Sequence, residues 1–262
     1  MNWIEALILG VVQGLTEFLP VSSSGHLELG KALLNVEAQG DLSFAIVVHG
    51  ATVLSIIVVF FADLKKIFID SLEFRWNDSV KYLVKIIISM IPVAVVGLFF
   101  RDRVESLFTG NIVLVGCMLM VTAVLLIASG YGGSGKKTIP FSHSFIIGIA
   151  QAVAVIPGIS RSGATIATGL LLGNMKEHVT RFSFLMVLLP IIAANVLDLF
   201  SGDLTRSSSV GAGPLIIGFL AAFISGLIAC RWMINIVRKG ILAWFGIYCF
   251  IAGGAAILTG IL

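Results

Sequence analysis

A carboxylate, three hydroxyls and an imidazole lie close together near the N-terminus of this chain. Glu17 is followed by Ser22, Ser23, Ser24 and His26, in a segment broken by proline and glycine and flanked by apolar residues. Such polar groups are costly to bury in lipid, so their clustering indicates a functional site. A hydroxyl beside an imidazole and a carboxylate is the arrangement of nucleophilic or general acid–base catalysis.

Gln13 and Glu17 are four residues apart, so on a helix they share one face. Three roles stay open for Glu17: ligand of a divalent cation, general base, or salt-bridge partner of Arg161. The structural alternative is a carboxylate that reaches the membrane surface from a helix end. We disfavour it because the flanking Leu15 and Phe18 leave little route to water except through a cavity.

A second broken polar segment lies 138 residues downstream of the first. The shift aligns five residues of the first segment with identical residues of the second: Gly10 with Gly148, Gln13 with Gln151, Ser22 with Ser160, Ser24 with Ser162 and Gly25 with Gly163. The match continues to Phe44 against Phe182. We therefore expect an internal duplication, with a binding site where the two halves meet.

Both segments contain Ser-x-Ser-Gly directly before a helical pattern, at residues 22–25 and 160–163. Each predicts a helix N-cap followed by free backbone N–H groups, and two such N-termini together would suit a phosphate group. Arg161 adds a fixed, bidentate positive charge. The structural alternative is plain capping and helix packing. His49 aligns with the apolar Val187, and we expect it to be structural.

The elements that must position these residues are membrane helices. The chain has 262 residues, of which 58% are hydrophobic and 12% charged, and its mean hydropathy is +1.07. This composition excludes a soluble globular domain, and the net charge of +3 gives no argument for nucleic acid as a partner. Six stretches are apolar and long enough to span a bilayer: residues 44–62, 82–100, 112–129, 182–200, 214–230 and 241–262.

Two shorter apolar stretches, residues 3–16 and 142–156, run directly into the broken segments. We interpret each as the first arm of a re-entrant hairpin, because non-helical backbone at membrane depth must face protein or a watery cavity. A re-entrant hairpin enters and leaves the membrane on the same side, so each half crosses the membrane only with its three spans. Because three is odd, the second half should be inverted relative to the first. The expected fold is an all-α integral membrane protein with an inverted-topology repeat. It forms one membrane domain over residues 1–262, with repeat one at 1–130, a Gly/Ser linker at 130–138 and repeat two at 139–262.

The basic residues give this topology an orientation. Twelve of the 17 Lys and Arg residues fall on one side: Lys65, Lys66, Arg75, Lys81, Lys85, Lys136, Lys137, Lys176, Arg181, Arg231, Arg238 and Lys239. The positive-inside rule makes that side cytoplasmic and puts both termini outside. In the alternative, all eight apolar stretches span, the duplication is parallel, and Glu17 and Arg161 cross lipid.

Two motifs resemble those of the undecaprenyl-diphosphate phosphatase (bacitracin-resistance) family. They are Gln13-x-x-x-Glu17 followed by Pro-Val-Ser-Ser-Ser-Gly-His26, and Pro157-Gly-Ile-Ser-Arg-Ser-Gly-Ala-Thr165. The resemblance extends over nearly the whole chain. It implies an enzyme of the cell membrane that hydrolyses a polyprenyl diphosphate to the monophosphate and inorganic phosphate, with a divalent cation. This reaction recycles the lipid carrier of cell-envelope glycan synthesis.

The resemblance also implies roles for individual residues. The implied catalytic residues are Glu17, Ser23, His26 and Arg161, and the implied substrate-binding residues are Gln13, Ser22, Ser24, Gly25, Ser160, Ser162 and Gly163. Ser23 as nucleophile with His26 as base, and His26 itself as nucleophile, both stay open; we favour Ser23.

The acidic motif departs from the family in one position, because many members have Glu where this chain has Gln13. Hard cations prefer charged oxygen ligands, so a single carboxylate weakens the case for tight metal binding by the protein alone. We expect Mg²⁺ or Ca²⁺ to be bridged by the diphosphate, with Glu17 and Gln13 as the protein ligands.

The rival function is a secondary transporter or flippase, because paired broken helices in inverted repeats are typical of transporters. The same site would then carry a phosphorylated lipid or a small anion. Phosphate release by the purified protein distinguishes the two functions. The expected partners are the membrane and a polyprenyl diphosphate lipid, without nucleic acid, and a homodimer is left open.

Overall fold

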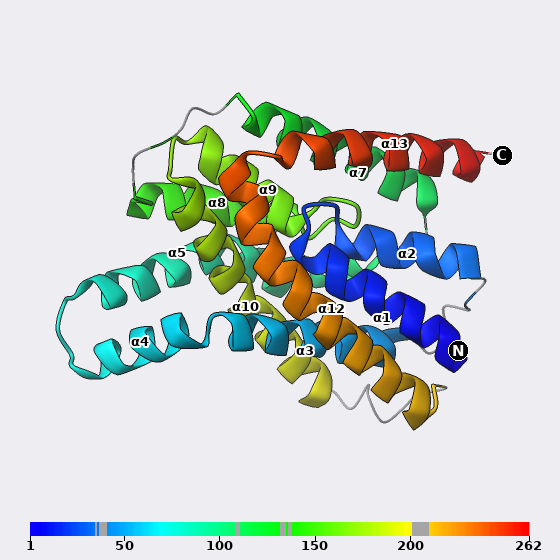
Figure 1. Ribbon diagram of the computed structural model, residues 1–262, viewed down its shortest axis with the longest axis horizontal. Coiled ribbons are helices and arrows are strands. Elements are labelled where there is room, and N and C mark those ends of the chain that lie inside the picture. The colour runs from blue at the N-terminus through cyan, green and yellow to red at the C-terminus, as the bar shows by residue number, and fades with distance from the viewer. Residues whose placement is uncertain are drawn as a thin grey trace.

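The described part of the chain consists of helices joined by turns. The computed structural model describes residues 1–34, 36, 41–107, 111–131, 135, 138–200 and 210–261. The helices before the Gly-rich stretch are α1 (Trp3–Phe18), α2 (Ser23–Leu34), α3 (Asp41–Val59), α4 (Phe61–Leu72), α5 (Asp78–Phe99), α6 (Arg101–Glu105) and α7 (Ile112–Ser129). Those after it are α8 (Phe141–Val153), α9 (Arg161–Leu171), α10 (Lys176–Phe200), α12 (Ala212–Lys239) and α13 (Leu242–Ile261). Figure 1 shows their arrangement.

The helices confirm a multi-pass membrane protein. Within the described residues, α5, α7, α12 and α13 are each long and apolar enough to cross a bilayer, and α3 and α4 reach that criterion only as a pair. Four of the predicted spans, at residues 82–100, 112–129, 214–230 and 241–262, are therefore confirmed. The span predicted at 182–200 lies in α10, where the side chains of residues 194–200 are outside the described part.

The span predicted at residues 44–62 has the predicted length but lies three residues closer to the N-terminus. It ends at Val59, and α4 follows at an angle of 74° to α3. Phe60, at the bend, is buried and packs against Phe184, with ring centroids 6.0 Å apart. The next twelve residues carry four charges, at Asp63, Lys65, Lys66 and Asp70. A helix with this charge density is not stable in hydrocarbon, which explains why the span stops there.

The two broken segments each join a pair of short helices. α1 turns into α2 through residues 19–22, and α8 turns into α9 through residues 154–160. Neither α1, with 16 residues, nor α8, with 13, reaches the usual length of a spanning helix. The expectation of paired short helices around each break is therefore confirmed.

Glycines let α1 and α8 approach long helices very closely. A Cβ atom on Gly10 of α1 would lie 2.5 Å from the carbonyl oxygen of Gly218 in α12, and one on Gly148 of α8 would overlap the backbone of Ser89 in α5. Small residues at such crossings allow backbone contact in membranes, where packing rather than hydrophobicity drives association. α1 is thus fixed on α12, and α8 on α5.

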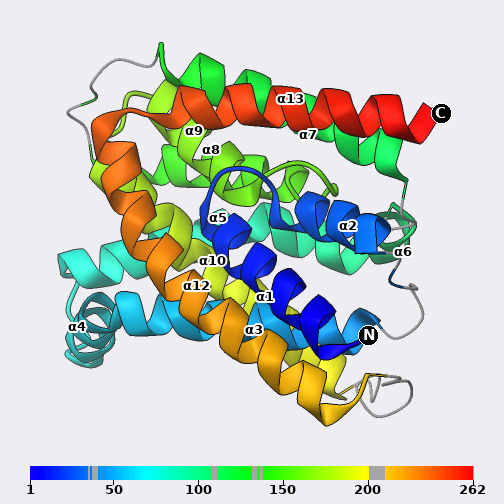
Figure 2. The same ribbon diagram turned by 45° about the vertical axis from the view of Figure 1, so that its right-hand side comes forward.

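α7 and α13 pack along each other and hold the two loops in place (Figure 2). The Thr122 hydroxyl of α7 donates to the carbonyl oxygen of Gly158 (3.1 Å) and accepts from the Ser160 N–H (3.0 Å). Cys249 of α13 lies 3.8 Å from the carbonyl oxygen of Pro20. Each loop is therefore supported by a different helix of this pair.

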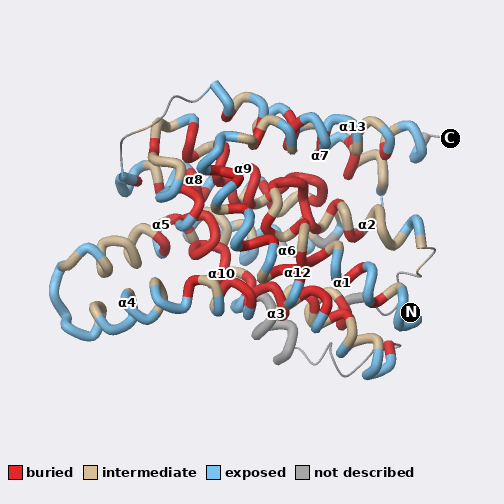
Figure 3. The backbone as a smooth tube through the Cα atoms, viewed as in Figure 1, coloured by how far each residue is buried: buried red, intermediate tan, exposed pale blue. Residues whose placement is uncertain are grey.

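The buried interior contains polar as well as apolar side chains. Figure 3 shows that burial is greatest in the middle of the molecule, around α9 and α10, whereas α4 is largely exposed or half-buried. Gln13, Gln151 and Ser160 are each no more than 1% exposed. Polar groups at this depth need hydrogen-bond partners within the protein or in a bound ligand. The candidate site therefore lies where these buried polar residues gather. Most of the predicted linker at 130–138 lies outside the described residues.

Candidate active site

Glu17, near the end of α1, is the centre of the polar cluster. Its side chain is 5% exposed and forms an ion pair with Arg161, with 2.8 Å between Oε1 and Nη2. Its other oxygen, Oε2, accepts hydrogen bonds from Ser23 Oγ (2.7 Å) and Gln13 Nε2 (2.9 Å). One carboxylate therefore connects the start of α9 to the start of α2. Of the roles left open by the sequence, the ion pair with Arg161 is present in this structure.

His49 of α3 belongs to the same cluster, contrary to the expectation that it is only structural. Its Nδ1–H donates to the carbonyl oxygen of Ala45 (2.8 Å), so the neutral ring carries no proton on Nε2. That nitrogen lies 3.9 Å from Glu17 Oε2. Val187, with which His49 aligns after the shift of 138, also lines the cavity beside Glu17 and Arg161.

His26 has other partners than the serine hydroxyls beside it. Its Nδ1–H donates to the carbonyl oxygen of Ser22 (2.9 Å), and its Nε2 accepts from the Tyr248 hydroxyl of α13 (2.7 Å). The two rings are stacked, with centroids 5.6 Å apart. Ser23 instead donates to Glu17. The Ser23 hydroxyl is therefore hydrogen-bonded to Glu17, whereas both ring nitrogens of His26 have other partners.

The serine pairs cap both hairpin helices, as the sequence predicts. Ser160 Oγ accepts from the Gly163 N–H (3.0 Å) and lies 3.3 Å from Ser162 Oγ. Ser22 Oγ likewise accepts from the Gly25 N–H (3.3 Å), and Ser22 has a φ of +69°, in the left-handed region. The first amides of α2 and α9 have no partner within their helices, and such helix starts attract anions.

The two loops touch, which brings these helix starts together. A Cβ on Gly25 would lie 3.2 Å from the Cα of Gly158, and one on Gly163 would lie 3.3 Å from the Cβ of Pro20. Ser162 Oγ donates across the same contact to the carbonyl oxygen of Leu19 (3.3 Å). The structure thus gathers all the predicted site residues around one contact between the loops.

A small cavity of about 10 Å³ lies beside the Glu17–Arg161 pair. Glu17 lines it from the first half of the chain, and Gln151, Thr165 and Ser183 line it from the second. Its volume corresponds to about one water molecule. Gln151 Nε2 is buried without a hydrogen-bond partner, so a donor is left over at this wall. The sequence marked Gln151 only through its alignment with Gln13, and nothing in it marked Ser183.

The residues supply few ligands for a metal ion. Within the described residues, there is no group of three His, Cys, Asp or Glu side chains placed to hold one. Glu17 offers a carboxylate, and Gln13 Oε1 is a buried acceptor without a partner. Mg²⁺ takes six oxygen ligands and Ca²⁺ six to eight. These two side chains therefore fit a cation only if a bound diphosphate and water supply the other oxygens.

The contact between His26 and the Ser22 carbonyl gives a testable prediction. An Asn side chain can still donate to that carbonyl, whereas Ala cannot. We expect His26→Asn to turn over roughly fivefold faster than His26→Ala, the ratio for one net hydrogen bond of about 1 kcal/mol. Turnover of a prenyl diphosphate by both variants measures the difference. Equal and complete loss in both would instead make the imidazole a proton carrier or a nucleophile.

Known proteins resemble this chain over almost its whole length. The family model described as bacitracin resistance protein BacA matches residues 6–255. The undecaprenyl-diphosphatase of Bacteroides thetaiotaomicron is 51% identical over 99% of both chains. That of Parabacteroides distasonis is 53% identical over 97% of this chain and 96% of its own. A protein of the same name from Methanobrevibacter smithii is 38% identical over 97% of this chain and 96% of its own. A site built by Glu17, Ser23 and Arg161 thus lies within a full-length match, and the chain belongs to the bacitracin resistance protein BacA family.

Proposed function

We propose that this chain is an undecaprenyl-diphosphatase, a membrane enzyme that converts undecaprenyl diphosphate and water to undecaprenyl phosphate and inorganic phosphate. The reaction recycles the lipid carrier of cell-envelope glycan synthesis. The observation that carries the proposal is the position of Glu17, which contacts a hydroxyl nucleophile and a phosphate-binding arginine at once. Relatives with this name match the chain over nearly its full length.

The reaction proceeds through Ser23. Its Oγ attacks the terminal phosphorus and forms an ester bond while its proton passes to Glu17 Oε2, 2.7 Å away. The bond from that phosphorus to the bridging oxygen breaks, and undecaprenyl phosphate leaves with the electron pair and with the proton from Glu17, which is again a carboxylate. Water then attacks the phosphoserine, again giving a proton to Glu17. The Ser23 oxygen takes a proton back, and inorganic phosphate is released.

The other groups position the head group and offset its charge. Arg161 can bind two phosphate oxygens with its planar guanidinium, and the first amides of α2 and α9 donate to the others. Gln151 Nε2, a buried donor without a partner, contributes from the cavity wall. A divalent cation would be held by Glu17, Gln13 and the diphosphate, where it would neutralise phosphate charge. The prenyl chain lies between helices in lipid, so only the head group enters the site.

The fold that supports this site is an inverted repeat. α1 packs on α12, and α8 packs on α5, so each hairpin lies on a helix of the other half. Gly25 approaches Gly158, and Gly163 approaches Pro20. Under the shift of 138 residues the first pair becomes the second, as expected when two halves are related by a twofold axis. In such folds the site lies between the repeats.

The proposed orientation puts both termini outside the cell. The two chain ends lie at one end of the bundle, and the α4–α5 turn lies at the opposite end (Figure 1). Arg75 lies in that turn, and Lys65 and Lys66 lie in α4. We expect tags at both termini to be accessible from outside intact cells, and a tag between residues 132 and 137 to be protected. Termini on opposite faces would contradict the inverted repeat.

Phosphate release by the purified protein tests the function directly. The protein in detergent should release inorganic phosphate from undecaprenyl diphosphate, and Glu17→Gln should release it much more slowly. Glu73→Gln serves as the matched control because Glu73 lies exposed at the α4–α5 turn, far from the site. A transporter for phosphorylated lipids would release no phosphate, and that result would overturn the proposal.

Gln13 allows a test of the cation. Replacing it with Glu would bring a second carboxylate next to Glu17 Oε2, where Gln13 Nε2 now donates at 2.9 Å. Two carboxylates at this distance repel unless a proton or a cation lies between them. We therefore expect Gln13→Glu to tighten the apparent affinity for divalent cation and to make activity more sensitive to a chelator. An unchanged cation titration would exclude a metal contact at this position.

A further inference from the structure

α4 has a packed side and a free side of different character. No residue of this helix is fully buried. Leu64 and Ile67 are partly buried and pack against the main hydrophobic core. Phe61, Phe68 and Leu72 are 61%, 67% and 58% exposed. These three positions follow one another at intervals of seven and four residues, so they form one stripe along the helix.

Both acidic side chains of α4 are engaged with neighbouring helices. Asp63 lies 3.6 Å from Arg181 of α10, and Asp70 accepts a hydrogen bond from Ser79 of α5. Lys65 and Lys66, in contrast, are exposed, and neither forms an ion pair with another described residue. The free surface of α4 therefore combines an apolar stripe with unpaired positive charge.

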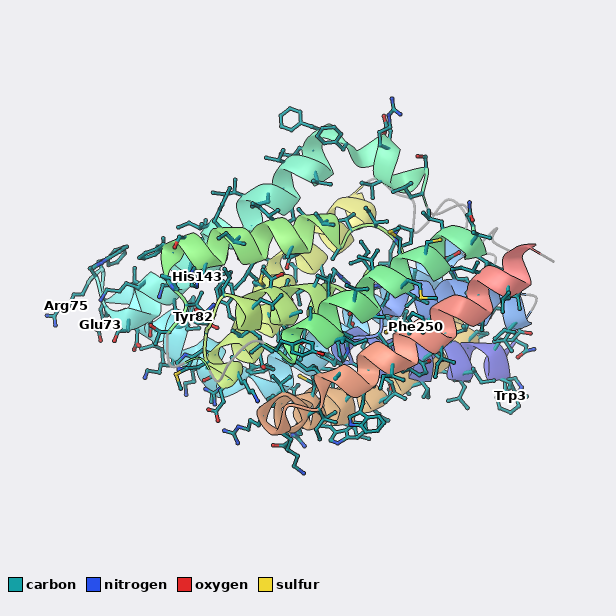
Figure 4. All side chains as sticks on the ribbon, turned by 90° about the horizontal axis from the view of Figure 1, so that it is seen from above. Trp3, Glu73, Arg75, Tyr82, His143 and Phe250 are labelled. Atoms are coloured by element: carbon teal, nitrogen blue, oxygen red, sulfur yellow. The ribbon has the colours of Figure 1, made fainter. Side chains whose placement is uncertain are left out.

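The turn after α4 continues this surface. Phe74 is 93% exposed and Trp76 is 64% exposed, and Arg75 between them is exposed as well. Figure 4 shows Glu73 and Arg75 at the far end of the arm that α4 and α5 form, with Tyr82 closer to the bundle. Aromatic and cationic side chains together are typical of residues at the boundary between hydrocarbon and lipid head groups.

We propose that α4 and its turn, residues 61–76, lie in the membrane interface and bind the anionic head groups of phospholipids. The stripe formed by Phe61, Phe68 and Leu72 enters the acyl boundary, and Lys65, Lys66 and Arg75 contact lipid phosphates. The proposal is independent of the phosphatase reaction.

The position of α4 in the chain favours lipid over a protein partner. α3 has 19 residues, close to the length of a membrane crossing, so its end at Val59 lies near a bilayer surface. The 74° bend then directs α4 away from the direction of α3 and towards the membrane plane. α5, which begins at Asp78, returns into the bilayer. Both ends of α4 are thus tethered at the interface, and its free charge has the sign that anionic lipids attract.

Spin labels on opposite sides of α4 test the proposal in the complete protein. Phe68→Cys puts a label on the apolar stripe. Lys66→Cys is the matched control, because two residues correspond to a rotation of about 200° around a helix. Cys117, Cys230 and Cys249 are first replaced by Ala, and retained phosphate release shows that this background is folded. Collision of each label with oxygen, which prefers lipid, and with a water-soluble nickel complex is measured in nanodiscs of phosphatidylglycerol or phosphatidylcholine.

We expect the label at position 68 to collide mainly with oxygen, and the label at position 66 mainly with nickel. In phosphatidylglycerol the label at 68 should lie deeper than in phosphatidylcholine, and Lys65→Gln should reduce this difference. Nickel access at both positions would place α4 in water and overturn the proposal. Exclusion of both agents at 68, with dipolar broadening between labels, would mean that a second copy covers the stripe. Equal depth in both lipids would refute recognition of anionic head groups.

Discussion

Replacing Glu17 with Gln should lower the rate of phosphate release by roughly 10²- to 10⁴-fold, the usual contribution of a general base. Gln keeps the shape of the side chain but cannot take the proton of Ser23, whose Oγ lies 2.7 Å from the carboxylate. Turnover of undecaprenyl diphosphate by purified variants measures the effect. Thermal stability, recorded in parallel, separates lost chemistry from lost structure.

Ser23→Ala provides the control for this result. If Ser23 and Glu17 act as a nucleophile and its base, each single variant should lose about as much activity as the double variant, because residues that act as a unit are not additive. Independent and multiplicative losses would separate the two residues. Near-normal turnover of Glu17→Gln would remove Glu17 from the reaction and leave it a structural partner of Arg161.

Arg161→Lys should fold normally and still lose about 10²-fold or more in turnover, the scale found when one stabilising donor is removed from an active site. Lys keeps the charge that pairs with Glu17 but lacks the planar pair of donors that can hold two phosphate oxygens. The variant should therefore have a near-normal melting temperature and a low rate.

Arg161→Ala should lose stability as well as activity. It leaves the Glu17 carboxylate, 5% exposed, without a counterion, and breaking a buried ion pair in this way costs roughly 3 kcal/mol. Measuring phosphate release and melting temperature of both variants distinguishes the two roles. Near-normal turnover in Arg161→Lys would show that Arg161 only neutralises Glu17.

The sequence predicted the paired segments well because their signals are local. The pattern Ser-x-Ser-Gly contains both groups that form the cap, the Ser160 hydroxyl and the Gly163 N–H. The predicted N-cap at Ser160 is therefore present. The helix at residues 112–129 has the predicted bounds because an uninterrupted apolar run of this length forms a helix that spans the bilayer. The ion pair between Glu17 and Arg161 was one of three roles that the sequence left open.

The residues that the sequence did not identify reach the site from other helices. Tyr248 is an aromatic residue in an apolar span, and only the packing of α13 against the first loop places its hydroxyl at His26. His49 was set aside because Val187, its aligned residue, is apolar. Both positions nevertheless lie beside Glu17. The alignment of the two halves therefore predicted that the two residues lie in equivalent places, although their side chains differ in chemistry. α4 was missed because four of its twelve residues are charged, which hides the apolar stripe in the sequence.

The ion pair between Glu17 and Arg161 makes Glu17 a competitor of the substrate phosphate for Arg161. In the absence of a ligand, the carboxylate occupies a position on the guanidinium that a phosphate oxygen would otherwise take. A carboxylate held on α1 has a high effective concentration at Arg161, so weakly charged head groups should be rejected. Once water has released the phosphate from Ser23, Glu17 can pair with Arg161 again and displace the product. An inhibitor of this site must therefore carry an anionic group that displaces the Glu17 carboxylate from Arg161 and that stays attached to the inhibitor.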